Sequence, residues 1–220
     1  MKLSIVYDNE AKEGFIGDWG FSCLIESGAW KILFDTGASG EILTHNLQRL
    51  GIEKEEITII ALSHKHWDHV GGLEAVLHPG VAVCLPSSLP LGLKKYVAKK
   101  AARIVEVSES KEIVPGVYTT GDFGIPVKEQ SLVLETTGGE GVVVVTGCAH
   151  PGLENILEDV EKVFGRLYGV IGGFHGFDKL EVLQGLKLIM PCHFTRRRKE
   201  IADMYPEAIA GCGAGTVIEL

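Results

Sequence analysis

The sequence of 220 residues lacks any apolar run long enough to cross a bilayer and any linker rich in proline, glycine or serine. The first absence argues against a membrane-spanning protein, and the second favours a single domain over residues 1–220. The apolar N-terminal stretch breaks at Asp8, which is too early for a signal peptide. We therefore expect a cytoplasmic protein.

Cysteine is scarce and forms no CxxC pair. The five scattered cysteines argue against a cysteine zinc site and against a disulfide framework. Cys148 and Cys192 lie near histidines that are candidate ligands. We interpret both cysteines as small buried residues beside a site.

Positive charge is in deficit, because the formal net charge is −8 at pH 7. This balance argues against nucleic acid as a partner and leaves a small-molecule substrate as the expected one. Hydrophobic residues make up 45% of the chain, which is ordinary for a globular protein with a packed core. The oligomeric state cannot be inferred from the sequence.

Apolar patterning predicts alternating strands and helices along the chain. Strands are expected at 2–8, 21–27, 30–36, 57–62, 81–85, 131–136, 141–147, 167–173, 187–193 and 216–220. Helices are expected at 41–51, from 68 onward, and at 151–165, 177–185 and 195–206. Each half of the chain has strands followed by helices. This order predicts an α/β (α+β) fold in which two sheets pack together with helices outside.

Four side chains of metal-ligand type lie within six residues, directly after the apolar strand 57–62. His64 and His66 are two residues apart, so their imidazoles point the same way in an extended backbone. Asp68 and His69 follow on the next turn and can face the same pocket. This spacing predicts a metal site rather than a solvated polar loop.

Two later histidines fit the same design, because His150 and His193 each end an apolar strand as His64 does. Functional sites in α/β architectures collect at the carboxyl ends of strands. Either histidine alone is explained equally well as a ligand or as a satisfied polar residue. Together with the first cluster, both are predicted to be ligands.

Imidazole and carboxylate ligands suit zinc, our first choice, and also iron, nickel or manganese. One divalent metal held by His64, His66 and His150 would keep a fourth position for water. A second metal is expected on Asp68, His69 and His193. Two metals about 3.5–4 Å apart can share a hydroxide that attacks a substrate.

Several ordered segments resemble the motifs of the metallo-β-lactamase superfamily, and the resemblance covers nearly the whole chain. These segments are FDTG at 34–37, LSHKHWDHVGG at 62–72, GCAH at 147–150 and PCH at 191–193. GCAHPGLENI at 147–156 and IGGFHGF at 171–177 are similar to one branch, the β-lactamase superfamily II metal-dependent hydrolases. That branch includes proteins resembling dihydropterin-ribofuranosyl-aminobenzene-phosphate synthase. The resemblance implies a four-layer αββα sandwich with two metals at one edge of the sheets.

The resemblance assigns the two metals to the same two sets of ligands. It implies that Asp35 orients the metal-binding loop through hydrogen bonds, with an ordinary turn residue as the alternative. One departure is that 171–175 carries no counterpart of the aspartate that bridges the metals in most members. His175 in that segment can replace it, contact substrate or simply pack, and the sequence does not choose among these roles.

Residues that could contact a substrate surround these motifs. Trp67 can wall the pocket or pack on its own loop. Arg196 and Arg197, in a run of four basic residues, can attract an anion, and a solvated helix face is the alternative. We expect the segment 86–96 to help to cover the pocket.

The leading functional hypothesis is hydrolysis by metal-bound hydroxide, with Asp68 acting as both ligand and base. The expected substrate is an ester, phosphodiester, thioester or lactone of a small anionic molecule. One alternative is a pterin-phosphate synthase-like reaction in which the metals act as Lewis acids. The other alternative is a metal-binding sensor or scaffold without turnover.

Overall fold

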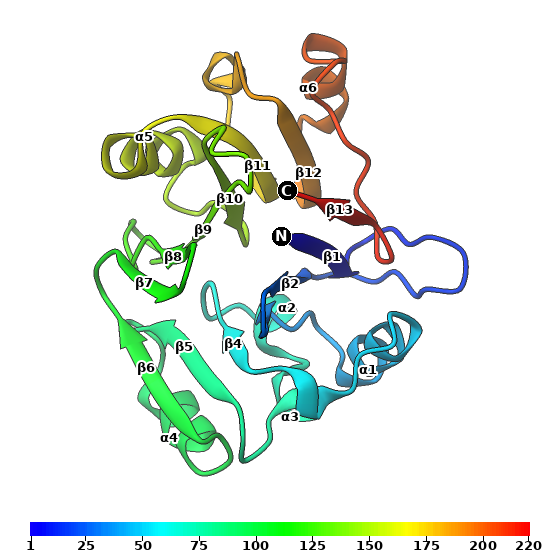
Figure 1. Ribbon diagram of the computed structural model, residues 1–220, viewed down its shortest axis with the longest axis vertical. Coiled ribbons are helices and arrows are strands. Elements are labelled where there is room, and N and C mark those ends of the chain that lie inside the picture. Colours follow the sequence, from blue (N-terminus) through cyan, green and yellow to red (C-terminus); the bar gives the residue numbers. More distant parts are fainter.

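The computed structural model describes residues 1–220 as two β-sheets packed face to face, with helices on both outer faces (Figure 1). The first sheet has seven strands in the order β13-β1-β2-β3-β4-β5-β6. Their bounds are Lys2–Tyr7 (β1), Ser22–Ser27 (β2), Trp30–Phe34 (β3), Ile59–Ala61 (β4), Ala82–Pro86 (β5), Arg103–Val107 (β6) and Val217–Glu219 (β13). The strands from β13 to β3 pair antiparallel and those from β3 to β6 pair parallel.

The second sheet has six strands in the order β12-β11-β10-β9-β8-β7. Their bounds are Lys111–Val114 (β7), Val117–Thr119 (β8), Leu132–Glu135 (β9), Val142–Thr146 (β10), Leu167–His175 (β11) and Leu188–Thr195 (β12). Strands β10, β11 and β12 pair parallel, whereas β7 to β10 pair antiparallel.

The helices lie on the outer faces of the two sheets (Figure 1). Their bounds are Gly40–Arg49 (α1), Trp67–Val70 (α2), Leu73–Val76 (α3), Leu91–Ala98 (α4), Leu153–Phe164 (α5) and Arg198–Met204 (α6), with 3₁₀ turns at Lys54–Glu56 and Leu180–Leu183. None of these helices combines the length and the apolar character needed to cross a membrane.

Strand β4 shows why the expected four-layer αββα sandwich forms. Ile59 and Ala61 point into the apolar core between the sheets, and Ile60 and Leu62 point into the core beneath α1, α3 and α4. A third apolar core lies between the second sheet and α5. Because alternate side chains enter different cores, a continuous apolar run is buried on both faces, as predicted.

Helix α5 is held on the second sheet by one apolar stripe. Leu153, Ile156, Leu157 and Val160 recur at helical spacing and are all buried. Each such side chain contributes about 1.5–3 kcal/mol when it leaves water. Gly165 ends the helix with φ +80°, a left-handed conformation that glycine adopts without a steric penalty.

Three strands were not predicted from the sequence, namely β6, β7 and β8. Strands β6 and β7 are the edge strands of their sheets, and β8 lies next to β7. Both edge strands are short and carry exposed charged residues that weaken the apolar alternation. The helix expected from residue 68 is divided into α2 and α3 at Gly71 and Gly72. A Cβ atom at Gly71 would lie 2.2 Å from the carbonyl oxygen of Ala38, so this chain crossing requires glycine.

Cys192 is not the free buried residue that the sequence suggested, because it forms a disulfide with Cys212. This bond joins β12 to the loop that precedes β13. Disulfides are uncommon in reducing cytosol, so the redox state of this pair bears on the expected cytoplasmic location. The two termini meet beside this region, where the amino group of Met1 lies 3.0 Å from the carbonyl oxygen of Leu220.

Candidate metal centre

The six predicted ligands are brought together where loops leave the carboxyl ends of parallel strands. They fall into two groups, and the ligand atoms in each group lie within 4.8 Å of one another. We call the first group, His64, His66 and His150, the histidine triad. We call the second group, Asp68, His69 and His193, the mixed triad.

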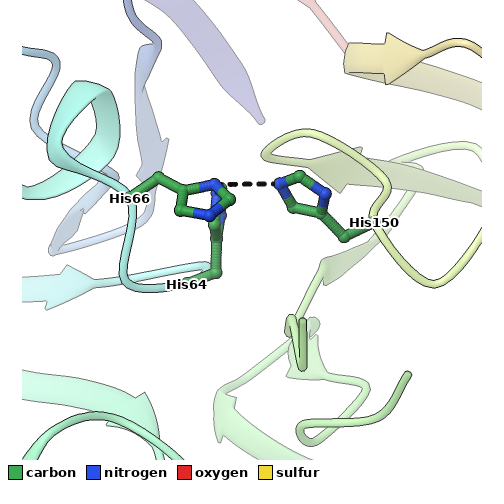
Figure 2. A group of neighbouring side chains, drawn as sticks. All are labelled: His64, His66 and His150. Carbon is green, nitrogen blue, oxygen red and sulfur yellow. Dashed lines mark hydrogen bonds between the residues drawn. The ribbon is translucent and has the colours of Figure 1, made fainter. Parts of the chain in front are cut away.

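The rings of the histidine triad converge from the two sheets (Figure 2). His64 follows β4, His66 precedes α2, and His150 follows β10. The Nδ1 atom of His66 lies 2.9 Å from Nε2 of His64 and 3.1 Å from Nε2 of His150. A metal about 2.0–2.1 Å from each nitrogen leaves neighbouring nitrogens about 3 Å apart. The spacing therefore fits three ligands on one face of a cation.

A hydrogen-bond chain orients the first ring of this triad. Ser63 Oγ donates to Asp35 Oδ2 across 2.6 Å and lies 2.8 Å from Nδ1 of His64. Because the hydroxyl proton goes to Asp35, the hydroxyl oxygen accepts the Nδ1 proton of His64. The lone pair of His64 Nε2 is then directed to the centre of the triad.

The two histidines of the mixed triad are oriented in the same way. Nδ1 of His69 donates to Asp35 Oδ2 across 2.7 Å, and Nδ1 of His193 donates to Asn9 Oδ1 across 2.9 Å. Each ring thus points its Nε2 atom into the site. Fixing a histidine ligand through its second nitrogen is the usual arrangement around protein-bound metals.

One atom of the mixed triad fits a cation particularly well. Nε2 of His193 is buried and has no hydrogen-bond partner. Asp68 Oδ2 lies 3.3 Å away, but it already accepts the indole N–H of Trp19 across 2.8 Å. A lone pair facing a carboxylate in a buried space is unfavourable unless a cation lies between them. The residues present therefore fit a bound metal.

Asp35 connects the two triads. Its carboxylate also accepts the backbone N–H of Ser63 across 2.7 Å, and the residue is fully buried. The geometry is that required for the orienting role that the resemblance implied. Sequence reasoning missed Ser63 and Asn9, which act as acceptors for ligand rings.

Backbone strain is concentrated at this site. The non-glycine residues with positive φ are Asp35 (+58°), Ala149 (+56°), His175 (+49°) and His193 (+43°). All four lie at or beside the triads. Such conformations cost of order 1–3 kcal/mol each and persist where the surrounding structure holds them, which is typical of functional sites.

The histidine triad is held in the neutral form. Burial lowers the pKa of His64 well below its ordinary value, and the neighbouring histidines lower it further. Burial also lowers the pKa of His66 and brings that of His150 to about 4. These imidazoles are therefore uncharged at neutral pH, as metal ligation requires.

In the mixed triad the pKa of one histidine is raised, whereas the histidine pKa values in the histidine triad are lowered. Burial raises the pKa of Asp35. Burial acts to lower the pKa of His69, but the Asp35 carboxylate outweighs this effect and raises the pKa of His69 well above its ordinary value. The pair therefore holds a proton at neutral pH. The pKa of Asp68 is lowered despite its burial, because the imidazole of His193 lies 3.3 Å from it and His69 is nearby, so Asp68 is ionised.

Glu129 is a further residue that sequence reasoning missed. It is 1% exposed, and its Oε1 atom accepts backbone N–H groups from Gly147, Cys148 and Ala149 at 2.9–3.1 Å. Its Oε2 atom accepts the N–H of His150 across 3.0 Å. The carboxylate therefore holds the loop that presents His150. No motif marks this glutamate, because its partners are 18 to 21 residues distant in the chain.

Gly172 and Gly173, in the segment without the bridging aspartate, have no room for a side chain. A Cβ atom at Gly172 would lie 1.9 Å from the carbonyl oxygen of Thr146, and one at Gly173 would lie 2.5 Å from that of Gly147. His175 is exposed, and its ring centre lies 5.1 Å from that of His150, outside both triads.

The other predicted contact residues lie at the surface. Trp67 is 63% exposed on α2. Arg196 is exposed and forms no ion pair, whereas Arg197 is paired with Asp178 and Glu200.

Two hollows flank the site and share Pro126. One, of about 320 Å³, lies between Lys65 and the loop 124–128, which ends in Lys128, and Ser88 and Leu89 also line it. Ser88 and Leu89 belong to the segment 86–96, whose expected role as a cover of the metal pocket stays a prediction. The other, of about 560 Å³, is lined by both His150 and His175.

Comparison with known proteins identifies the family. The family model described as the metallo-beta-lactamase superfamily matches residues 20–187. The chain belongs to this superfamily. The match spans β2 to the loop before β12 and thus includes five of the six predicted ligands.

Two superfamily relatives come from Methanocaldococcus jannaschii. A 7,8-dihydropterin-6-methyl-4-(beta-D-ribofuranosyl)-aminobenzene-5'-phosphate synthase is 28% identical over 214 residues, covering 74% of this chain and 73% of the relative. An uncharacterized protein is 30% identical over 206 residues, covering 79% and 78%. Among solved structures, Tm1679, described as a metal-dependent hydrolase of the beta-lactamase superfamily, superposes with a TM-score of 0.85. It is 26% identical and covers 100% of this chain and 99% of its own.

Proposed function

We propose that the chain is a metal-dependent hydrolase that cleaves an ester, phosphodiester, thioester or lactone bond in a small anionic substrate. The observation that carries this proposal is the convergence of six ligand side chains into two adjacent triads. The Nε2 atom of His193 is buried without a hydrogen-bond partner, and the Nε2 atoms of His64 and His150 both face Nδ1 of His66. The similarity to Tm1679, described as a metal-dependent hydrolase, supports the same class of reaction.

We propose two divalent metals, with zinc as first choice and iron, nickel or manganese as alternatives, because the donors are imidazole and carboxylate. The histidine triad would hold one metal and the mixed triad the other. A bound divalent metal lowers the pKa of coordinated water to about 7 and so supplies a nucleophile at neutral pH.

The protein side chains have separate tasks in this reaction. Asp68 is ionised at neutral pH and lies at the inner wall of the site, so it is placed to accept a proton. Asp35, Ser63 and Asn9 orient the ligand rings. The strained backbone at His193 keeps that ring aimed inward.

The substrate anion is proposed to bind in the hollow beside Lys65 and Lys128. Two cationic side chains at one small hollow favour a phosphate or carboxylate group. Arg196 has no ion pair and remains a second candidate for this contact, whereas Arg197 already faces two carboxylates. Trp67 and His175, exposed at the surface, are proposed to contact the uncharged part of the substrate.

The proposal is tested with purified protein, stripped of metal and then reloaded with zinc, on a panel of chromogenic phosphodiesters, thioesters and lactones. We expect turnover to require metal. The His66→Ala variant should lose more than about 100-fold in kcat/KM, because even outer partners of metal ligands are worth about 10–100-fold. His45→Ala removes a histidine from α1, distant from the triads in sequence and fold, and should retain activity. Metal-independent turnover, or full activity in His66→Ala, would refute the proposal.

A second candidate is a synthase-like reaction, favoured by the similarity to the 7,8-dihydropterin-6-methyl-4-(beta-D-ribofuranosyl)-aminobenzene-5'-phosphate synthase over about three quarters of each chain. The two reactions are separated by running turnover in ¹⁸O-labelled water and analysing the products by mass spectrometry. Labelled oxygen in the product supports hydrolysis. A new carbon bond without label supports the synthase-like reaction.

A further inference from the structure

Cys148 lies between the two triads rather than beside them. Its Sγ atom is 3.1 Å from Nε2 of His69, and the residue is 4% exposed. The ligand atoms of Cys148, His69 and His64 lie within 4.8 Å of one another. His69 belongs to the mixed triad and His64 to the histidine triad, so the sulfur lies within 4.8 Å of a ligand atom in each group.

The backbone fixes the sulfur at this point. The N–H of Cys148 donates to Glu129 across 2.9 Å, and the next residue, Ala149, has φ +56°. Opposite the cysteine, a Cβ atom on Gly173 would lie 3.3 Å from the Cα of Cys148. Glycine at position 173 of β11 therefore lets the backbone of Cys148 pack closely against this strand.

The remaining free thiols show what ordinary buried cysteines look like in this chain. Cys23 lies in the apolar core between the sheets, and Cys84 lies 4.0 Å from the amide oxygen of Gln130. Neither is part of a group of ligand atoms. Cys148 differs because it faces an imidazole nitrogen whose other nitrogen is already bound to Asp35.

A second observation points to a ligand in the same space. The Nε2 atom of His193 is buried without a hydrogen-bond partner, and the ring centre of His193 lies 5.2 Å from that of His69. His69 is therefore close both to the sulfur of Cys148 and to the ring of His193, whose Nε2 atom has no partner.

We propose that the Cys148 thiolate is a metal ligand between the histidine triad and the mixed triad. On binding, the S–H bond breaks, a sulfur–metal bond forms, and the proton passes to solvent, with no change of oxidation state. This inference rests on the proposed function, because it needs a metal at the triads. A soft thiolate among imidazoles favours zinc, cobalt or iron over magnesium or manganese.

The test measures metal–sulfur bonding in the full chain. Protein stripped of metal and reduced is loaded with zinc for X-ray absorption, and with cobalt(II) for thiolate-to-cobalt charge-transfer bands in the near ultraviolet. We expect sulfur at about 2.3 Å from zinc, and the cobalt bands, in the natural chain. Cys148→Ala and Cys148→Ser should lose both signals and at least about tenfold in affinity for one of two cobalt ions. Cys23→Ala, which removes an equally buried thiol, should keep both signals.

Three outcomes would overturn the inference. The first is a natural chain that binds zinc and turns over substrate without any sulfur neighbour, which would leave the proposed function intact. The second is a sulfur signal that persists in both Cys148 variants. The third is its loss from a Cys192→Ser, Cys212→Ser double variant, which would assign the sulfur to the reduced disulfide pair. A chain that binds neither metal would overturn the proposed function as well. The absorption measurement on the natural chain decides even where a Cys148 variant fails to fold.

Discussion

The two triads use different means to present ligands to the same site. The histidine triad is built from three like rings, and two of them, His66 and His150, are only partly buried. The mixed triad combines a carboxylate with two buried rings, each tied to an acidic or amide acceptor. Burial keeps the rings of the histidine triad uncharged. In the mixed triad, by contrast, the pair of Asp35 and His69 holds a proton. We therefore expect the first group to bind metal as it stands and the second to lose a proton first.

Replacing the residues that accept hydrogen bonds from the ligand rings is expected to have the largest effect on metal affinity at the two triads. Asp35→Asn removes an acceptor shared by His69 and, through Ser63, by His64. We expect metal affinity to fall about 10–100-fold at both triads, as for other outer partners of metal ligands. Asn9→Ala removes only the acceptor of His193 and should weaken the mixed triad alone. Metal titration with elemental analysis should give close to one metal per chain for Asn9→Ala and less for Asp35→Asn. Equal losses in the two variants would contradict the assignment.

Glu129 offers a way to weaken the histidine triad from outside it. Glu129→Gln keeps one acceptor oxygen but places an amide N–H against a backbone N–H of the loop 147–150. An unsatisfied buried donor costs about 1–3 kcal/mol, so we expect a loss of that size in the free energy of unfolding. Because His150 is on this loop, metal affinity at the histidine triad should fall with it. Glu135→Gln changes an exposed carboxylate on β9 and should alter neither quantity in denaturation and metal titration.

The proton content of the triads gives a prediction about pH. In the metal-free protein the pKa of His69 is raised, so metal uptake by the mixed triad should release a proton near neutral pH and tighten as pH rises. The pKa of His150 is lowered to about 4, so uptake by the histidine triad should release none until pH approaches that value. Calorimetry in buffers of different ionisation enthalpy measures the protons released. The natural chain should release more protons in total than Asn9→Ala, and equal release would contradict the difference between the triads.

The sequence predicted which candidate ligands converge better than it predicted their supports, and the reason is local. His64, His66, Asp68 and His69 share one short segment after a buried strand, so their spacing alone brings them together. Asn9 and Glu129 become important only when the loop after β1 meets β12 and the loop before β9 meets the loop after β10. No short-range sequence pattern predicts tertiary contacts of this kind. The αββα layers were predictable because the apolar runs in β4 and β10 can be buried only between two layers.

Replacing Trp19 is expected to cause the smallest loss of metal affinity, and to affect the mixed triad alone. Its indole N–H donates to Asp68 Oδ2 across 2.8 Å, and its ring packs edge-on against His193 at 4.9 Å. Trp19→Phe keeps an aromatic ring but removes the donor. A hydrogen bond to a charged group is worth about 1.5–3 kcal/mol, and the partial exposure of Trp19 (43%) reduces this value. We therefore expect a loss of about fivefold in metal affinity at the mixed triad, measured by competition with a chromogenic chelator. Trp30→Phe, a comparably exposed tryptophan on β3, is the matched control. An unchanged affinity in Trp19→Phe would mean that Asp68 is held by its metal and by His193 without the indole, and the selectivity between the triads would then rest on Asn9 and Asp35 alone.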